Sequence, residues 1–175
     1  MPPTALPPLF FAQPTAHVAR ALLGCSLQFG PHEGVITETE AYLPEGDQAA
    51  HAFRGRTPRT EVLYGPPGRA YVFLIYGIHH CLNVVCEPEG TPGCVLIRAV
   101  HGWGDGPGKL TRHAGITLAH NGLPLTILPP ADPPAGILVT SRIGIRHSRE
   151  LLLRFVLDPA IRYNGERLRA RSSAG

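Results

Sequence analysis

The chain has 175 residues, of which 43% are apolar, so it is long enough to bury the core of one domain. Its net charge is +3 with neutral histidines, and fifteen of its sixteen basic residues are arginines. The preference for arginine permits a nucleic-acid partner but also fits a simple codon preference. The longest apolar run, residues 71–78, is too short to cross a bilayer.

A helix is expected at residues 14–24, because Pro14 suits its first turn and Gly24 its end. Strands are predicted in the apolar runs between turn residues: 25–29, 34–39, 70–75, 82–86, 94–100, 125–128 and 136–140. A second helix is expected at 110–119, and residues 151–157 fit either a strand or a helix. Strands outnumber helices, which predicts an α+β fold: a single mixed domain with a central antiparallel β-sheet and a few peripheral helices.

The two ends of the chain differ from its middle in composition. Residues 1–8 are rich in proline and residues 164–175 are polar, so we expect a flexible N-terminus, a single domain over residues 9–163 and a flexible C-terminal tail. No basic segment precedes Arg20, so no signal peptide is expected, and we predict a cytoplasmic or nucleoid-associated protein without membrane contact.

Three polar side chains alternate along one segment that is extended if the predicted strand continues past residue 39: Glu38, Glu40 and Tyr42. Alternate residues of a strand share a face, so two carboxylates would lie beside an aromatic ring. This arrangement suits activation of a water molecule next to a bound ring, and a solvent-facing strand edge is the plain alternative.

Aromatic side chains follow the same rule in the next strand. Tyr71, Phe73 and Ile75 share a face that would either sandwich a planar ligand or pack in the core. Tyr76 differs because it precedes Gly77 at an expected turn, where an exposed ring could insert into a stack of bases.

Two polar residues lie inside apolar runs, Asn83 and Arg98. A buried amide needs a hydrogen bond to the backbone or to a ligand, and a buried guanidinium needs an anion, for which Glu38 and Glu40 are candidates. A purely structural network would meet the same needs.

The four cysteines, residues 25, 81, 86 and 94, form no CxxC pair, so buried free thiols are expected, although Cys86 and Cys94 could face each other across a hairpin. The adjacent His79 and His80 would point to opposite faces of a strand and could not easily share an ion. We therefore expect no metal site.

Taken together, these segments resemble the alkyladenine (3-methyladenine) DNA glycosylase family. The matching stretches run in order over most of residues 9–157: Phe10–Pro14, Ala19–Gly24, Glu38–Tyr42, Ala49–His51, Thr57–Arg59, Tyr71–Gly77, Asn83, Cys94–Arg98, Gly106–Thr111 and Arg142–Ile145. The resemblance implies one mixed α/β domain on an antiparallel sheet, without metal or cofactor. Two features depart from the family pattern. Phe73 stands where the pattern has tyrosine, and the segment between Val100 and Leu110 is shorter than in longer members of the family.

The resemblance also implies roles for individual residues. Glu40 would activate the attacking water with help from Arg98, and three rings would enclose a base lifted out of DNA: Tyr42, His51 and Phe73. Asn83 would lie against the edge of the base and discriminate against guanine, and Tyr76 would fill the gap in the duplex. Contacts to the DNA backbone are assigned to a basic loop and two further segments: Arg56, Thr57, Arg59, Lys109 and Arg142.

The expected activity is that of a monofunctional, monomeric DNA repair glycosylase. It would hydrolyse the N-glycosidic bond of alkylated purines in double-stranded DNA, with deaminated purines as a further class, and leave an abasic site. Lys109 is the only lysine and lies in a Gly-rich segment, which argues against a Schiff base. A non-catalytic nucleic-acid-binding module would not need Glu40 or His51, and a nucleoside hydrolase would not need Tyr76.

Overall fold

The long strand β2 (His32–Tyr42) organises the sheet by pairing with three other strands. The structure, a computed structural model, describes residues 3–158, 162–163 and 166–167. The remaining strands of the antiparallel sheet are β1 (Ser26–Phe29), β3 (Ala70–Ile75), β4 (His79–Cys86), β5 (Gly93–Val100), β6 (Gly104–Asp105), β7 (Thr126–Leu128), β8 (Ile137–Thr140) and β9 (Arg154–Leu157). A separate pair is formed by β10 (Arg162–Tyr163) and β11 (Glu166–Arg167).

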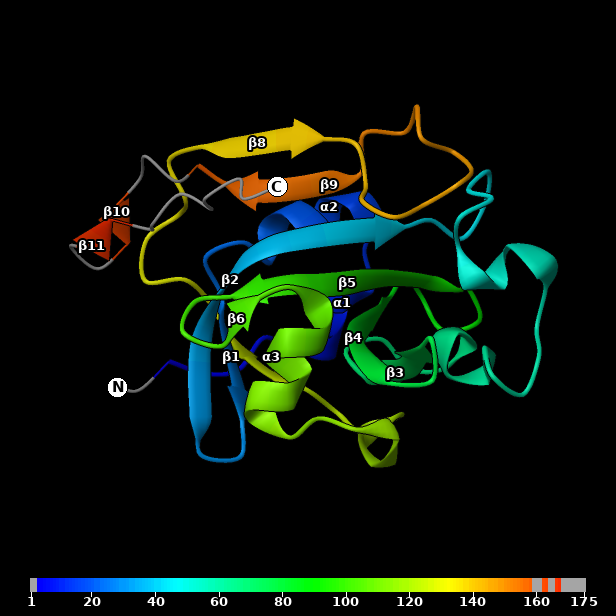
Figure 1. The fold of residues 1–175 in the computed structure, drawn as a ribbon, viewed down its shortest axis with the longest axis horizontal. Helices are drawn as coiled ribbons and strands as arrows, with labels where there is room; N and C mark the ends of the chain where they lie inside the picture. The colour runs from blue at the N-terminus through cyan, green and yellow to red at the C-terminus, as the bar shows by residue number, and fades with distance from the viewer. Residues whose placement is uncertain (1–2, 159–161, 164–165, 168–175) are drawn as a thin grey trace.

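The helices are short and lie around this sheet. They are α1 (Pro8–Phe11), α2 (Thr15–Ala21) and α3 (Pro107–Ala114), with the 3₁₀ turns η1 (His51–Arg54), η2 (Glu61–Tyr64) and η3 (Leu118–His120). The predicted α+β class, one mixed domain on an antiparallel sheet, is confirmed (Figure 1). No helix in the described part of the chain has the length and apolar character needed to span a membrane.

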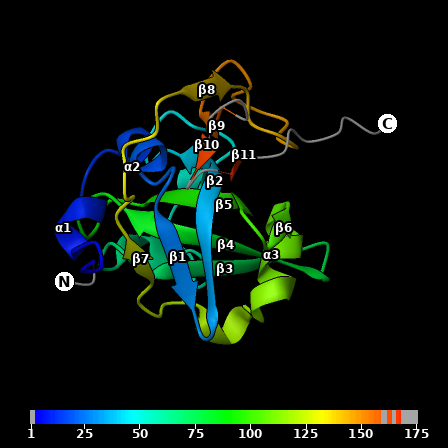
Figure 2. The same cartoon turned by 90° about the vertical axis from the view of Figure 1, so that its left-hand side faces the viewer.

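A change of partner along β2 gives the sheet its curl. The first half of β2 pairs with β1, and residues 38–40 pair with β9 instead, while a bulge at Glu38 shifts the register with β5. As a result, β1 and the first half of β2 run steeply across β3, β4 and β5 (Figure 2).

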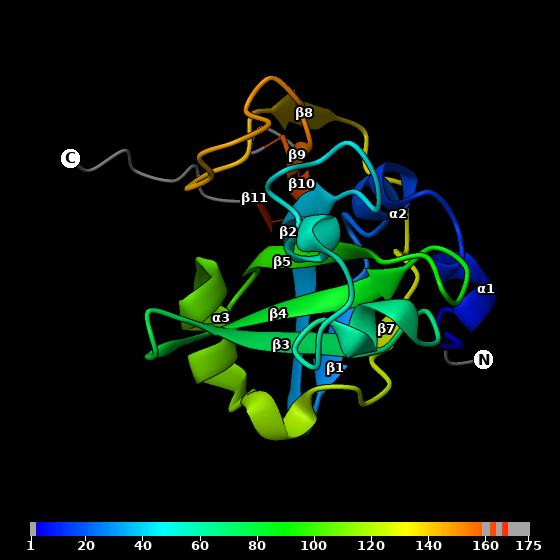
Figure 3. The same cartoon turned by 90° about the vertical axis from the view of Figure 1, so that its right-hand side faces the viewer.

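The strands β3, β4 and β5 separate their side chains onto two faces. One set enters the main core beneath α2 and α3: Val72, Leu82, Val84, Val95 and Ile97. The other set faces the opposite side of the sheet: Tyr71, Phe73, Asn83, Cys94 and Arg98. Figure 3 shows the loop of residues 43–69 in front of these three strands, with the orange 141–153 segment above them.

Several predicted boundaries moved for identifiable reasons. The second helix spans residues 107–114 instead of 110–119, because Pro107 suits a first turn and Gly115, with φ of 71°, ends the helix in the left-handed region. Residues 154–157 form a strand, which settles the ambiguous segment 151–157.

All four cysteines are free and buried, as predicted. The β4–β5 register places Cys94 opposite Val85 and Cys86 opposite Gly93, so these two side chains point to opposite faces. At the N-terminus, the Leu6 amide donates a hydrogen bond to the Ile127 carbonyl at 2.8 Å. The predicted flexible tail, residues 164–175, lies outside the described residues apart from Glu166–Arg167.

Candidate functional site

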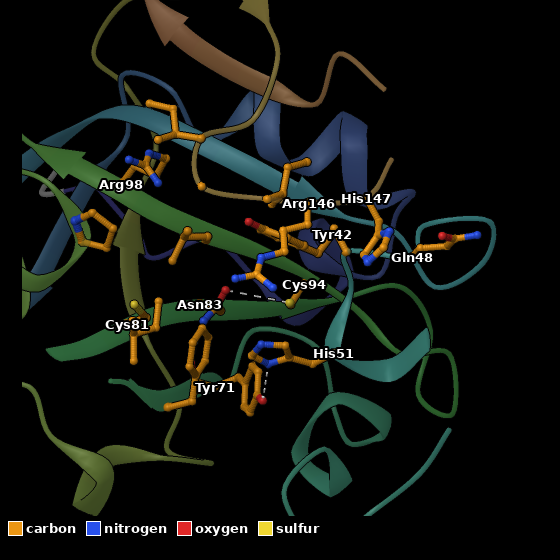
Figure 4. Close-up of a pocket in the computed structure, with 18 of the residues that line it drawn as sticks. Tyr42, Gln48, His51, Tyr71, Cys81, Asn83, Cys94, Arg98, Arg146 and His147 are labelled. Atoms are coloured by element: carbon orange, nitrogen blue, oxygen red, sulfur yellow. Dashed lines mark hydrogen bonds between the residues drawn. The ribbon is translucent and has the colours of Figure 1, made fainter. Parts of the chain in front are cut away.

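A cavity of about 500 Å³ opens on the sheet face away from the main core (Figure 4). Its floor consists of side chains from β3, β4 and β5, and its walls come from residues 48–59 and residues 143–147. A volume of this size is typical of small-molecule sites and holds one planar heterocycle. No group of three metal-ligating side chains occurs in the portion of the chain that the structure describes.

The strand register aligns the central residues of this site in one row. Tyr71 lies opposite Asn83, Asn83 opposite Leu96, and Leu96 opposite Glu40. Residues directly opposite each other in antiparallel strands share a face, with Cβ atoms roughly 5 Å apart. The row therefore joins the predicted ring, amide and carboxylate across four strands.

Glu40 is fully buried, and both of its carboxylate oxygens have partners. Its Oε1 accepts a hydrogen bond from the Ile143 amide at 2.8 Å and lies 3.6 Å from Arg98 Nη1. Its Oε2 accepts a hydrogen bond from the Tyr42 hydroxyl at 2.9 Å. These three partners line the cavity and Glu40 lies directly behind them, so the carboxylate contacts the cavity through the groups that hold it.

Arg98 is held between two carboxylates, which confirms the predicted need for an anion and shows that both candidates supply one. Glu38 Oε1 accepts hydrogen bonds from Arg98 Nε at 3.0 Å and from Arg154 Nε at 2.6 Å. Charges of opposite sign thus alternate in the order Arg154, Glu38, Arg98, Glu40. Glu38, whose role the sequence left open, fixes the Arg98 guanidinium toward Glu40.

Three rings form a corner of the cavity: His51, Tyr71 and Phe73. The His51 and Phe73 rings are 4.4 Å apart between centroids at 68°, and His51 Nδ1 lies 2.8 Å from the Tyr71 hydroxyl. Burial against these rings and then the nearby charge of Arg59 lower the pKa of His51 to about 4, so its imidazole is neutral at pH 7. Burial raises the pKa of Tyr71 to about 12.

Tyr42 closes the cavity next to Glu40. Its pKa lies far above the ordinary value for tyrosine, first because of burial and then because the Glu40 carboxylate beside it disfavours a second negative charge. The hydroxyl therefore stays protonated and remains a hydrogen-bond donor to Glu40.

Asn83 is buried and fully oriented by the protein. Its Nδ2 donates to the Tyr71 carbonyl at 3.1 Å, and its Oδ1 accepts from the Cys94 thiol at 3.8 Å. Of the two predicted kinds of partner, backbone or ligand, the structure shows the backbone, and Asn83 also lines the cavity.

Tyr76 occupies the tip of the β3–β4 hairpin, as expected for an exposed ring at a turn. Its side chain is 91% exposed and its φ is 53°, followed by Gly77 at 69°. A non-glycine residue with positive φ is uncommon and strained. Because exposure and strain coincide here, stability does not explain the choice of tyrosine.

The residues assigned to DNA backbone contacts divide into two groups. Four are exposed on the surface: Arg56, Thr57, Arg59 and Lys109. Arg59 also lines the cavity, with its guanidinium 5.5 Å from the centre of the Phe73 ring. The exposed Arg56 and Lys109 form ion pairs with Glu61 and Asp105, respectively.

The structure contradicts the assignment of Arg142 to this group. The Arg142 side chain is 0% exposed and forms a bidentate ion pair with the equally buried Asp47. A side chain without exposed surface cannot contact a phosphate. The partner is 95 residues away in sequence, so no local pattern revealed the pairing.

The wall formed by residues 143–147 was not predicted as part of the site. Figure 4 shows the Arg146 side chain pointing into the cavity, with His147 and Gln48 near its rim. The turn at Gly144, whose φ is 75°, was the available signal, because it interrupts an apolar segment next to Arg142. Three arginines line the cavity (Arg59, Arg98 and Arg146), and no carboxylate does so among the described residues.

Sequence comparisons identify the family to which the chain is similar. The model of the methylpurine-DNA glycosylase (MPG) family matches residues 9–104. The chain is 44% identical over 162 residues to a protein of Ehrlichia ruminantium, a match that covers 85% of this chain and 86% of the relative. It is 45% identical over 170 residues to a Rhodopseudomonas palustris protein (85% and 82% covered) and 41% identical over 168 residues to one from Rickettsia felis (90% and 95% covered). Each relative bears the name "Putative 3-methyladenine DNA glycosylase".

Proposed function

Because this chain belongs to the methylpurine-DNA glycosylase family and is a DNA glycosylase, we propose that it excises alkylated purines, 3-methyladenine among them, from double-stranded DNA. It hydrolyses the N-glycosidic bond and leaves an abasic site for base excision repair. The observation that carries this proposal is the buried Glu40 carboxylate, held by Tyr42, Ile143 and Arg98 directly behind a ring-lined cavity.

In this mechanism Glu40 acts as the general base. Glu40 is fully buried in the free protein, so the attacking water enters beside the Arg98–Glu40 contact, whose 3.6 Å separation is longer than a hydrogen bond. The water oxygen attacks the anomeric carbon, its proton passes to Glu40, and the electron pair of the breaking C–N bond leaves with the base. The carboxylate also stabilises the positive charge that develops on the sugar.

The rings hold the base that has left the duplex. A base in a stacked helix is out of reach, so we infer that the target nucleotide is flipped into the cavity. Tyr42, the neutral His51 and Phe73 then enclose the purine. Phe73 contributes a ring face without a hydroxyl, so its contact with the base is stacking alone.

Asn83 supplies selectivity at the edge of the base. Its amide is fixed by the Tyr71 carbonyl and the Cys94 thiol, so it cannot turn to accommodate a different edge. Guanine carries an exocyclic 2-amino group that adenine and hypoxanthine lack, and a fixed amide against that edge excludes it by contact or by leaving a polar group unpaired.

The arginines of the cavity extend the substrate range to deaminated purines. A neutral base such as hypoxanthine departs with negative charge, which Arg59, Arg98 and Arg146 can stabilise. An alkylated purine is already cationic and departs neutral, so it needs this help less.

The exposed residues around the cavity bind the duplex. Tyr76 at the hairpin tip enters the space vacated by the flipped nucleotide. Arg56, Thr57, Arg59 and Lys109 contact phosphates, with the two arginines as bidentate donors. Lys109 is exposed and does not line the cavity, so the chain's single lysine takes no part in a Schiff base, and the enzyme is monofunctional.

We propose that residues 9–163 form the glycosylase domain and that it acts as a monomer inside the cell, where its DNA substrate is found. The two alternatives fit the site less well. A non-catalytic DNA-binding module has no use for the buried Glu40, and a nucleoside hydrolase has no use for the exposed, strained Tyr76.

The proposal is tested with a duplex that carries one 3-methyladenine or one hypoxanthine at a defined position. The purified protein should convert the lesion to an abasic site, scored as alkali-dependent strand cleavage, without cleaving the strand itself. Absence of abasic sites with both lesions at enzyme excess would refute it, and strand nicking without alkali would refute the monofunctional mechanism.

A further inference from the structure

The buried pair Asp47–Arg142 joins two loops that lie side by side and form neighbouring parts of the cavity wall (Figure 4). Arg142 Nη1 donates to Asp47 Oδ2 at 2.6 Å and Nη2 to Asp47 Oδ1 at 2.8 Å. Replacing a buried ion pair by apolar side chains of similar volume is often neutral or stabilising, whereas removing one partner is strongly destabilising. A pair of this kind therefore calls for an explanation other than stability.

Asp47 organises the first part of this wall. Its Oδ2 also accepts a hydrogen bond from the Leu43 amide at 3.0 Å, and its Oδ1 accepts one from the Ala49 amide at 3.1 Å. The carboxylate thus fixes the turn between β2 and η1, which carries Gln48 and Ala49 on the cavity wall and leads to His51.

Arg142 organises the second part of the wall. Its Nη1 also donates to the Ala41 carbonyl at 3.0 Å, and its guanidinium lies 4.7 Å from the centre of the Tyr42 ring. The next residue is Ile143, whose amide donates to Glu40 at 2.8 Å. Arg142 Nε is buried without a hydrogen-bond partner in the described structure. The guanidinium therefore holds its place between the two loops although one of its nitrogen atoms makes no hydrogen bond.

We propose that Asp47 and Arg142 are positioning residues for base excision. They hold the Ile143 amide and the Tyr42 ring in place against the Glu40 carboxylate. The inference rests on the proposed function. Both hydrogen-bond donors to Glu40, the Tyr42 hydroxyl and the Ile143 amide, belong to segments that the pair fixes. A displacement of about 1 Å at a reacting centre lowers rates by on the order of 10²-fold.

The test separates stability from positioning with an apolar double variant, Asp47→Leu with Arg142→Met. It leaves no unpaired charge, and Met can still lie against Tyr42, but the Leu43 and Ala49 amides lose their acceptor, so we expect a folded protein with a moderately lowered unfolding temperature. Affinity for lesion-containing duplex should change by about twofold or less, while single-turnover excision falls by about 10²-fold. Asp47→Leu alone should lower both the unfolding temperature and the rate.

Two further variants complete the experiment. Arg142→Lys keeps the charge but loses the bidentate fork, and should fold, bind duplex normally and excise about tenfold more slowly. Leu27→Ala, a core change in β1 far from the cavity residues, should lower the unfolding temperature without slowing excision below that temperature.

Two results would overturn this inference and leave the proposed function intact. One is wild-type excision by the folded double variant. The other, decisive if the double variant does not fold, is wild-type excision by Arg142→Lys. Absence of excision by the wild-type protein in the same assay would instead refute the proposed function and this inference with it.

Discussion

The Tyr42 hydroxyl donates a hydrogen bond to Glu40 Oε2 at 2.9 Å, although the two residues are neighbours but one on the same strand. Alternate side chains of β2 point the same way, so the strand itself delivers a donor to its own carboxylate. This bond leaves Oε1 to the Ile143 amide and to Arg98. The Glu40 carboxylate is thus oriented at Oε2 by a residue of its own strand and at Oε1 by the Ile143 amide of a loop distant in sequence.

Tyr42→Phe should therefore slow excision without unfolding the protein. The ring that encloses the base remains, but a hydrogen bond to a charged group is lost, which is worth about 1.5–3 kcal/mol. We expect a single-turnover rate that is lower by about 10- to 100-fold. Tyr64→Phe is the matched control, because Tyr64 lies on η2 outside the cavity. Equal rates for Tyr42→Phe and the wild type would show that this donor does not act on Glu40.

The neutral state of His51 predicts a specific pH response. Its pKa in the folded protein is about 4, below its value of 6.5 when unperturbed. The unfolded chain therefore binds more protons than the folded one between these values, and the stability supplied by this group is full above pH 6.5 and declines as the pH falls toward 4. The excision rate should show no inflection near pH 6.5 from His51.

Titration of the His51 ring by NMR tests this directly. The midpoint should lie near pH 4 in the wild type and should move upward in Arg59→Ala, because the charge of Arg59 is the second cause of the shift. Arg54→Ala removes a neighbouring exposed arginine that is not a cause of the shift and should leave the midpoint unchanged. A wild-type midpoint near 6.5 would contradict the lowered pKa of His51 and the neutral state that follows from it.

Tyr76→Gly should leave the protein at least as stable as the wild type while it weakens the binding of lesion DNA. Glycine adopts positive φ without strain, so the free energy of unfolding should stay the same or rise by about 1 kcal/mol. The loss of the stacking ring should weaken the complex with lesion DNA by about 1–3 kcal/mol. A gel-shift titration with single-turnover kinetics measures both, and unchanged lesion affinity with unchanged excision would place Tyr76 on an unused surface.

Asn83→Ser addresses selectivity. The smaller side chain should admit the 2-amino group, so excision of normal guanine should rise relative to hypoxanthine. The loss of the bond to the Tyr71 carbonyl should lower stability by about 1 kcal/mol in either case, so the ratio of the two rates is the informative quantity. An unchanged ratio with a lowered unfolding temperature would make Asn83 a structural residue.

Local patterns in the sequence were sufficient for the side-chain faces and for the exposed hairpin tip. Alternation placed Tyr71 and Phe73 on one side of β3, and Gly77 marked the turn that exposes Tyr76. These properties depend on neighbours in the chain, which a sequence displays directly.

Properties set by distant partners could not be predicted in the same way. The row from Tyr71 to Glu40 depends on the registers of four strands, and the bulge at Glu38 depends on how β5 and β9 meet β2. The burial of Arg142 depends on Asp47, 95 residues earlier, so the resemblance that assigns this arginine to DNA contact has no local pattern to correct it.

The central claim is that Glu40 activates water, and single-turnover excision by Glu40→Gln tests it most directly. The amide keeps the shape of the side chain, since its oxygen can accept from the Ile143 amide and its NH₂ can donate to the Tyr42 hydroxyl. Glu61→Gln, an exposed carboxylate on η2, is the control and should excise at the wild-type rate. We predict that Glu40→Gln folds, binds lesion duplex as tightly as the wild type, and excises about 10²–10⁴-fold more slowly. Excision at more than about a tenth of the wild-type rate would contradict the role of Glu40 as the general base and make Glu38 the next candidate.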